Sequence, residues 1–454
     1  MKDASQAPGF SATVSATPRP VLSVFDGAMI VVGIVIGAGI FRTPSMVAGV
    51  TGSVEWMLTA WMLGGVLTLV GALCYAELAS TFPNAGGDYH FLTRAYGRDI
   101  SFFFAWARVA VITTGSIALL AFVFGDYMSR VVSLGPNSSA IYAALTVIVL
   151  TVLNIIGLRE SSRAQNVLTI LEVTGLLLVT LAGILATAPA TAPAASATTS
   201  GVPPLFGLAM VFVLLTYGGW NEGAYISAEV KGGPRAIVRT LVLAIVVITV
   251  VYLAFVLAVL NGLGIAGMKE SKAVGADVMQ AAFGPSGAQI IGVIVGIATL
   301  TSINATMIVG ARTNYALGRD WPQLAFMSQW QGARNVPMVA FFVQGGIALA
   351  LIAFGALQKD GFSAMVEFTA PVFWFFFLLT GIALIVLRLR EPTIARPFKV
   401  PLYPILPIVF IGTCGYLFYS SVTYAQSKQA VGIALYVMLA GLVVWALMRL
   451  TRRR

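Results

Sequence analysis

Two clusters of glycine residues interrupt apolar stretches of this sequence at points where a membrane helix should be most regular. One lies in "VVGIVIGAGIFRTPS" (residues 31–45) and the other in "LTYGGWNEGAY" (residues 215–225). The clusters consist of Gly33, Gly37 and Gly39, and of Gly218, Gly219 and Gly223. Glycine costs a helix about 1 kcal/mol per position relative to alanine, so the two clusters predict two deliberate interruptions of the helical backbone.

A helix that is interrupted inside a bilayer leaves peptide groups without partners, and these are tolerated where they line a cavity or meet a ligand. The N-terminus of a half-helix suits a carboxylate, whereas exposed carbonyl groups at a C-terminus suit an ammonium group or a cation. A zwitterion satisfies both ends, so an α-amino acid is the ligand class that fits two facing breaks best. The alternative for the first cluster is close helix packing, because Gly33 and Gly37 also have the G-x-x-x-G spacing.

Four ionisable side chains lie well inside apolar stretches, where an isolated charge is expensive and a functional role is the default hypothesis. Glu172 lies nine residues beyond Arg163. At 1.5 Å per residue this is about 13 Å, near the middle of the bilayer. A carboxyl group at this depth could bind and release a proton, which motivates the hypothesis of proton coupling through Glu172. The alternative is a neutral or ion-paired carboxyl group that only braces helices.

Three further charges are less informative. Arg108 stands nine residues after Asp99, at a depth similar to that of Glu172, and could pair with Glu172 or with another acid. Helix bracing is the favoured role for Arg108 over substrate contact. Glu222 follows the broken stretch of the sixth span and faces either the cavity, where it would favour cationic substrates, or the protein behind it. Glu367 has too little context for an assignment.

Several observations argue against an enzyme, a metal site or a channel. His90 is the only histidine and has no companion ligands. The sequence contains neither a nucleophile elbow nor a phosphate-binding loop, and it has no repeated filter or ring of like charges. No cofactor and no metal are therefore expected. The eighth apolar stretch has a polar side formed by Thr301, Ser302, Asn304 and Thr306. Its hydroxyl groups are expected to bond to carbonyl groups four residues earlier and not to bind sodium.

The composition defines the elements that must position these residues. Of 454 residues 58% are hydrophobic and 10% charged, and the mean hydropathy is +0.91. Soluble domains carry about 25% charged residues, so the chain is predicted to be an all-α integral membrane protein, with the lipid bilayer as its surroundings. Twelve apolar stretches reach the roughly 20 residues that a crossing requires. They cover residues 22–48, 54–77, 100–133, 137–157, 164–187, 204–230, 236–262, 284–316, 336–357, 361–389, 402–424 and 430–449.

The distribution of lysine and arginine predicts the orientation. Twenty of these residues fall on the side of the two termini and six on the other side, so both termini are predicted to be cytoplasmic, with the chain in the cell membrane. The net charge of +10 therefore indicates topology and not nucleic-acid binding. Cys74 and Cys414 both lie inside apolar stretches, so no disulfide-linked partner subunit is expected.

Five motifs occur along the chain in a characteristic order. They are "VGIVIGAGIFRTPS", "AELASTFPNAGGDYHFLTRAYG" (76–97), "YGGWNEGAYISAEVKGGPR" (217–235), "RTNYALGRD" (312–320) and "RPFKVPLYPILP" (396–407). Together they resemble the amino acid-polyamine-organocation (APC) superfamily, specifically bacterial relatives of the L-type amino acid transporters. The resemblance runs through the first eleven spans. It implies a five-plus-five inverted repeat with broken helices 1 and 6, followed by two extra helices and working by alternating access.

On this reading the chain has five parts. They are a disordered cytoplasmic tail (1–20), a first repeat (21–187), an extracellular linker rich in Ala, Pro and Thr (188–203), a second repeat (204–389), and two last helices with a basic cytoplasmic C-terminus (390–454). The implied function is secondary active transport of amino acids, with neutral substrates moved by proton symport or exchange. The alternative is an antiporter for cationic amino acids or polyamines.

The resemblance also assigns a substrate site residue by residue. The substrate carboxylate would meet the amides around Gly37, Ala38 and Gly39, and the ammonium group would meet carbonyl groups near Ile34 and Tyr217. Trp220 matches an aromatic residue that often gates such sites from outside. The remaining predicted site residues are Gly218, Gly219 and Glu222. Relatives commonly carry lysine where this chain has Glu172, so a fixed positive charge cannot be assumed at that position.

Overall fold

The structure is a computed structural model that describes residues 23–82, 87–156, 162–186, 201–223, 231–329, 336–425 and 427–452. Within these ranges the chain forms helices and no β-strand, which confirms the all-α fold class. The predicted tail, residues 1–20, and most of the predicted linker, residues 188–200, lie outside the described residues.

The helices follow the predicted apolar stretches closely. The first half of the chain forms α1 (Val24–Val35), η1 (Ala38–Phe41), α2 (Thr43–Thr51), α3 (Val54–Thr81), α4 (Asp88–Tyr96), α5 (Arg98–Ala107), η2 (Arg108–Ile112), α6 (Thr113–Val131), α7 (Ser138–Ile156) and α8 (Ser162–Leu185). The second half forms α9 (Phe206–Thr216), α10 (Trp220–Gly223), α11 (Pro234–Glu270), α12 (Val274–Asp320), η4 (Pro322–Ser328), α13 (Met338–Ala356), α14 (Gly361–Arg390), α15 (Ile405–Thr423) and α16 (Lys428–Arg452).

Nine helices in the described part of the chain are long and apolar enough to cross a membrane. The first and sixth predicted spans are not among them, because each is broken into shorter helices. The fifth contributes a shorter apolar segment, residues 170–185 of α8. The interruptions predicted from the glycine clusters are thus confirmed, while the number of twelve crossings stays a prediction.

Local sequence signals account for several helix boundaries. The side chains of Ser53 and Asp360 cap α3 and α14, each by accepting the backbone N–H three positions later, at 3.4 and 2.7 Å. Gly264 (φ 65°) kinks α11 and Gly284 (φ 70°) kinks α12. These kinks fall close to the predicted end of the seventh span and the predicted start of the eighth. Glycine at positive φ therefore marks where each long helix leaves its membrane-crossing direction.

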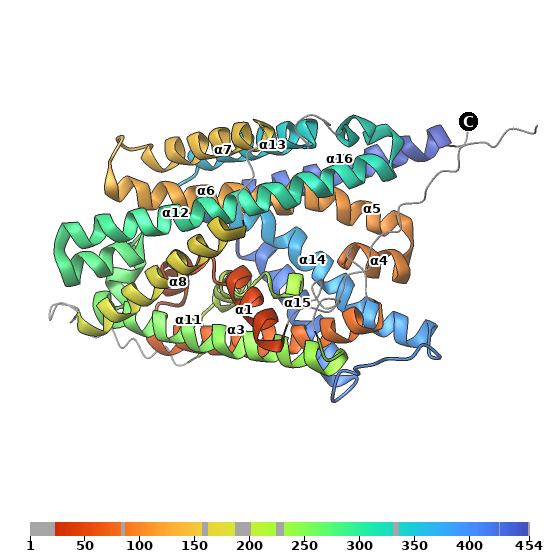
Figure 1. Ribbon diagram of the computed structural model, residues 1–454, viewed down its shortest axis with the longest axis horizontal. Coiled ribbons are helices and arrows are strands. Elements are labelled where there is room, and N and C mark those ends of the chain that lie inside the picture. The colour runs from red at the N-terminus through yellow and green to blue at the C-terminus, as the bar shows by residue number, and fades with distance from the viewer. Residues whose placement is uncertain are drawn as a thin grey trace, which may run out of the picture.

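The long helices lie side by side along the longest axis of the molecule, with the short α1 in the middle of the bundle (Figure 1). α6 packs against α7 and α12, and α3 packs against α11 and α15. α1 packs against α10 and α11, whereas α2 packs against α9. The first half of one broken span therefore contacts the second half of the other, which is the arrangement that an inverted repeat predicts.

Candidate functional site

The break in the first span presents backbone amides at its centre. α1 ends at Val35, Gly37 is extended (φ −121°, ψ −177°), and Ala38–Phe41 form a single 3₁₀ turn. The first N–H groups of such a turn have no partner within it. Among the described residues, the amides of Gly37, Ala38 and Gly39 donate no backbone hydrogen bond. A Cβ atom added at Gly37 would have only the Val35 carbonyl oxygen within 4 Å, at 3.9 Å, so the backbone is open to a ligand there.

The break in the sixth span is a turn at Tyr217, Gly218 and Gly219, between the end of α9 at Thr216 and the start of α10 at Trp220. Gly219 has φ 102°, a conformation that residues with a Cβ atom rarely adopt. The N–H of Gly218 folds back onto the Leu215 carbonyl oxygen at 3.0 Å. Gly218, where an added Cβ atom would lie 2.8 Å from the Leu215 carbonyl oxygen, and Gly219 are thus required by the local turn, whereas Gly223 belongs to α10.

The two breaks meet in the interior of the bundle. The Thr216 hydroxyl donates to the Thr43 hydroxyl oxygen at 2.7 Å, which joins α9 to α2. A Cβ atom added at Gly39 would lie 3.7 Å from the Thr216 side chain. The segment after one break and the end of the other helix are therefore in contact, and binding of both ends of a zwitterion between them stays a prediction.

Tyr252, on α11, connects the C-terminal ends of the two interrupted helices. Its hydroxyl lies 2.8 Å from the carbonyl oxygen of Val35 at the end of α1 and 3.2 Å from that of Thr216 at the end of α9. The ring is fully buried and makes edge contacts with Trp61 and Tyr217, at centroid distances of 5.8 and 5.1 Å. The sequence analysis missed this residue, because one tyrosine in a long apolar stretch carries no local signal.

Tyr217 is fully buried, as its place in the predicted site requires. Its hydroxyl donates to the Trp61 carbonyl oxygen at 3.2 Å. Its ring packs on Gly64, where an added Cβ atom would approach the ring to 3.1 Å. The carbonyl groups that face Tyr252 are those of Val35 and Thr216, one residue from the predicted Ile34 and Tyr217.

Trp220 lies behind the break. Its ring packs edge-on against Tyr75 of α3 and Phe377 of α14, with centroids 5.1 and 6.0 Å apart. A cavity of about 20 Å³ adjoins this aromatic cluster. Its lining includes Gly218, Trp220, Phe373, Phe377, Phe410 and Cys414. Trp220 thus contacts helices beside the sixth span, and its proposed role as an outer gate stays a prediction.

Glu172 is buried in α8, and its Oε1 atom has no hydrogen-bond partner among the described residues. It is close enough to Tyr252 for the two groups to interact electrostatically. Arg108 is half-buried and begins the π-helical turn η2 within the third span. A pairing of Arg108 with Glu172 stays a prediction.

Two predicted site residues are only partly described. The backbone of Ile34 belongs to α1 and that of Glu222 to α10, but both side chains lie outside the described residues.

The polar side of α12 is satisfied within the protein. Thr301, Ser302 and Thr306 each donate to the carbonyl oxygen four residues earlier, at 3.2, 3.4 and 2.8 Å. The Asn304 side-chain oxygen accepts a hydrogen bond from Asn154 of α7 at 2.6 Å. This is the backbone bonding that the sequence analysis expected of these hydroxyl groups. The described residues contain no group of three or more His, Cys, Asp and Glu side chains that could hold a metal ion.

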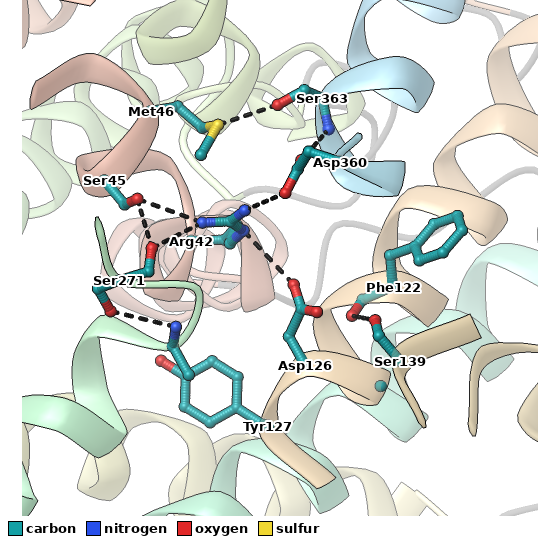
Figure 2. A network of polar contacts seen from close by, with 12 residues as sticks. Arg42, Ser45, Met46, Phe122, Asp126, Tyr127, Ser139, Ser271, Asp360 and Ser363 are labelled. Carbon is teal, nitrogen blue, oxygen red and sulfur yellow. Dashed lines mark hydrogen bonds and ion pairs between the residues drawn. The ribbon is translucent and has the colours of Figure 1, made fainter. Parts of the chain in front are cut away.

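A buried ionic network, the outer network, holds together the end of the bundle that is predicted to be extracellular. Figure 2 shows Arg42, which follows the first break, between Asp126 of α6 and Asp360 at the start of α14. Arg42 is 1% exposed; its Nε lies 3.5 Å from the Asp126 carboxylate, and its Nη2 donates to Asp360. Its Nη1 donates to the Ser271 carbonyl oxygen at 2.9 Å, and the Ser45 hydroxyl donates to the same oxygen at 2.6 Å.

The charge of Arg42 also determines how Asp360 titrates. Burial raises the pKa of the Asp360 carboxyl group, but Arg42 and hydrogen bonds from Ser363 outweigh burial and hold the pKa below its ordinary value of 3.8. The sequence analysis counted Arg42 only as a charge outside the membrane and missed both acids. Asp126, an acid inside the third apolar stretch, carried the same signal that singled out Glu172.

A second network lies at the opposite end of the same helices. Glu77 of α3 accepts a hydrogen bond from Arg388 of α14 at 2.7 Å and lies 3.5 Å from Arg396. The backbone N–H of Val400 donates to the same carboxylate at 2.6 Å. Glu77 is buried, so this carboxylate joins α3 to the segment that links α14 with α15.

Comparison with known proteins agrees with this architecture. The family model for amino acid permeases matches residues 22–447, nearly the whole chain. The chain is 28% identical over 423 residues to the serine/threonine exchanger SteT of Bacillus subtilis (strain 168), which covers 92% of this chain and 94% of SteT.

Two mammalian proteins are similar over comparable lengths. The b(0,+)-type amino acid transporter 1 of Mus musculus is 27% identical over 433 residues, 94% of this chain and 87% of that protein. The cystine/glutamate transporter of Homo sapiens is 26% identical over 434 residues, 94% of this chain and 84% of that protein. These relatives are transporters and not enzymes, in agreement with the function class expected from the motifs. The chain belongs to the amino acid permease family, whose members are membrane proteins that carry amino acids.

Proposed function

We propose that this permease carries neutral α-amino acids across the cell membrane by alternating access, and that it binds them between the breaks of its first and sixth spans. The single observation that carries this proposal is the meeting of the two breaks. The amides of Gly37, Ala38 and Gly39, which donate no backbone hydrogen bond among the described residues, lie on one break, and the carbonyl group of Thr216 lies at the end of the other. Amides suit the carboxylate of the substrate, and helix C-terminal carbonyl groups suit its ammonium group.

The outer network stabilises the state of the transport cycle in which the extracellular side is closed. Arg42 joins the segment after the first break to α6 and α14 through two acids. Substrate entry from this side requires α2 to separate from those helices. We assign the closed state of this structure to the extracellular side, in line with the predicted cytoplasmic location of both termini.

The mode of coupling has two candidates. Exchange is supported by SteT, whose name describes a serine/threonine exchanger and whose length this chain covers almost completely. Proton symport is supported by Glu172, a buried carboxyl group whose Oε1 atom has no hydrogen-bond partner among the described residues. The second substrate class, cationic amino acids or polyamines, depends on Glu222 facing the site.

The test is transport by purified protein in proteoliposomes, with labelled neutral and cationic amino acids and polyamines. Faster uptake with internal amino acid and no response to ion gradients would establish exchange. A response to an acid-outside gradient would establish proton symport. Uptake of neutral substrates in neither format would overturn the proposal, and a preference for lysine, arginine or polyamines would replace neutral with cationic specificity.

The role of Glu172 is tested in the same vesicles. Under proton symport, Glu172→Gln abolishes uptake driven by a pH gradient but retains amino acid binding. The matched control is Glu367→Gln, because Glu367 is an equally buried carboxyl group that accepts the Ser427 N–H at 2.7 Å, and glutamine keeps that acceptor. Intact gradient-driven uptake by Glu172→Gln would leave Glu172 a structural role.

Membrane orientation and partner subunits form the last part of the proposal. Both termini are assigned to the cytoplasm from the distribution of lysine and arginine. Cys74 and Cys414 are both buried, and a buried thiol is not accessible to a cysteine of another subunit. Protease protection of terminal tags in oriented vesicles tests the orientation.

A further inference from the structure

The cavity of about 20 Å³ beside Trp220 lies between the sixth-span break and the helices α3, α14 and α15. Its lining includes Gly218 of the break, Thr68 of α3, Trp374 of α14 and Cys414 of α15. Because α3 belongs to the first predicted repeat and α14 to the second, the cavity has walls from both repeats and adjoins the point where the sixth span is interrupted.

Two buried side chains that line this cavity have polar atoms without a protein partner. The Thr68 hydroxyl and the Trp374 Nε1 atom have no hydrogen-bond partner among the described residues, and the two residues are 3% and 4% exposed. Buried hydroxyl groups elsewhere in the bundle are satisfied, as in Thr299, which donates to the Val295 carbonyl oxygen at 2.7 Å. An unpaired buried polar group loses its hydration without compensation, so two such groups on one cavity indicate a polar ligand between them.

The break supplies a third polar group. Leu214, in the last turn of α9, also lines the cavity. In a regular α-helix its carbonyl oxygen would accept the N–H of Gly218, but this N–H donates to the Leu215 carbonyl oxygen at 3.0 Å instead. The turn at Gly218 thus releases the carbonyl oxygen of a residue that lines the cavity.

The size and the polar groups of the cavity identify the class of ligand. A cavity holds a water molecule when about 10–15 Å³ is open to the centre of a water-sized sphere and two to four polar groups are in reach, and this cavity meets both conditions. A water molecule can accept the Trp374 N–H, donate to the Leu214 carbonyl oxygen and bond to the Thr68 hydroxyl. An apolar ligand, such as a lipid chain, satisfies none of these groups.

We propose that this cavity binds a structural water molecule that joins the sixth-span break to α3 and α14. The water takes the place of the helical hydrogen bond that the turn at Gly218 removes. A water molecule can exchange its partners when the backbone moves, so the break can change shape without leaving a buried polar group unpaired. The inference goes beyond the proposed function and does not depend on the identity of the substrate.

The primary experiment is nuclear magnetic resonance of the unaltered protein, with its tryptophans labelled with ¹⁵N and their indole resonances assigned from single Trp→Phe variants. A bound water gives cross-peaks of opposite sign to the Trp374 indole N–H in NOE and ROE experiments, whereas hydrogen exchange gives the same sign in both. The internal control is Trp106, because its indole N–H donates to the Val437 carbonyl oxygen at 2.9 Å. We expect the bound-water signal at Trp374 and not at Trp106.

The second measurement removes one partner of the water. Thr68→Val keeps the shape of the side chain but not the hydroxyl, so the water signal at Trp374 should be lost, whereas Thr68→Ser should retain it. The matched control is Thr299→Val, which removes a hydroxyl that already has a carbonyl partner and should leave the signal unchanged. Absence of the signal from the unaltered protein, its persistence in Thr68→Val, or an equal loss in Thr299→Val would overturn the inference.

Transport kinetics separate this water from the substrate site. With labelled L-serine in proteoliposomes, Thr68→Val should lower the maximal rate about threefold and leave KM within about twofold, because the water supports a movement of the break and does not touch the substrate. A rise in KM at an unchanged maximal rate would make the cavity part of the substrate site and overturn the inference. Absence of any amino acid uptake by the unaltered protein would instead refute the proposed function, while the resonance experiment would still decide on the water.

Discussion

Replacement of Arg42 by methionine is the sharpest test of the outer network. Methionine keeps much of the length of the side chain but leaves the Asp126 and Asp360 carboxylates without their counter-ion. The Asp126 side chain is 9% exposed and that of Asp360 is 23% exposed, so neither regains full hydration while the outer side stays closed. The closed state is therefore destabilised relative to a state in which α2 has moved away and water reaches both acids.

The size of this effect follows from the burial of the three groups. Breaking a buried ion pair by removing one partner costs about 3–5 kcal/mol, and the partial exposure of Asp360 favours the lower end of this range. About 3 kcal/mol corresponds to roughly a hundredfold change in an equilibrium, because 1.4 kcal/mol is a factor of ten. The outward-open fraction of Arg42→Met should thus rise about a hundredfold, up to saturation.

Thiol labelling measures this fraction. Phe362 is 3% exposed and lies under the guanidinium group of Arg42, 5.6 Å from its central carbon to the ring centroid. Phe362→Cys is introduced after the two native cysteines are replaced by alanine, and labelling by a membrane-impermeant reagent is followed in intact cells. The control is Arg130→Met, because the Arg130 side chain is 42% exposed in its pair with Asp277, and pairs that water can reach contribute about 0–1 kcal/mol.

A charge-neutral variant separates electrostatics from packing. Arg42→Met combined with Asp126→Asn and Asp360→Asn contains no uncompensated buried charge, so its labelling should return toward that of the original protein. Labelling of Arg42→Met at the original rate would refute the reasoning. Labelling of the neutral triple variant as fast as the single variant would assign the effect to lost packing.

Three further predictions concern the breaks, the acid sensitivity of the outer network and the inner network. Gly219→Ala should lower the free energy of unfolding by about 1–3 kcal/mol, because alanine rarely adopts the positive φ of this position. Gly37→Ala should leave the melting temperature unchanged, because an added Cβ atom has room there, but should raise KM about tenfold. Fluorimetry measures the stability of both variants, and uptake measures KM. The ionised Asp360 carboxylate, whose pKa is lowered in the folded state, stabilises the fold above pH 3.8. This contribution is lost as the pH falls through the folded pKa. Between about pH 5 and pH 3, the melting temperature of the original protein should therefore fall faster than that of Asp360→Asn. Glu77→Gln should lower the melting temperature much more than Glu391→Gln does, because Glu77 is paired in a buried network whereas the partner of Glu391, Arg94, is exposed. Equal decreases in melting temperature would contradict the structural role of Glu77.

The sequence predicted those features that depend on local backbone chemistry. The glycine clusters predicted both breaks, because glycine weakens a helix at any interior position. The kinks at Gly264 and Gly284 fall close to predicted span boundaries. The dipoles of two interrupted helices predict an α-amino acid as the ligand class independently of the family motifs. These inferences need no knowledge of which helices are neighbours.

The features that were missed depend on tertiary contacts. Arg42 and Asp360 are 318 residues apart, and Val35 and Tyr252 are 217 residues apart. The type of a residue shows its possible bonds but not the partner that the fold supplies. Trp220 illustrates the limit, since the motif named the residue while its contacts with Tyr75 and Phe377 emerged only from the packing of α3 and α14.

We propose that the position of Arg42 beside the first break links substrate binding to closure of the outer side. The turn Ala38–Phe41, whose first amides face the proposed site, ends one residue before Arg42. A movement of this turn toward a bound carboxylate therefore also moves the backbone of Arg42, whose guanidinium group pairs with Asp126 and Asp360. On the other side of the break, Tyr252 fixes the end of α1, so that displacement is confined to the turn and α2. The turn and α2 lie between the fixed end of α1 and the ion pairs of Arg42. Their movement can thus transmit substrate binding to the outer side without a rearrangement of the long helices.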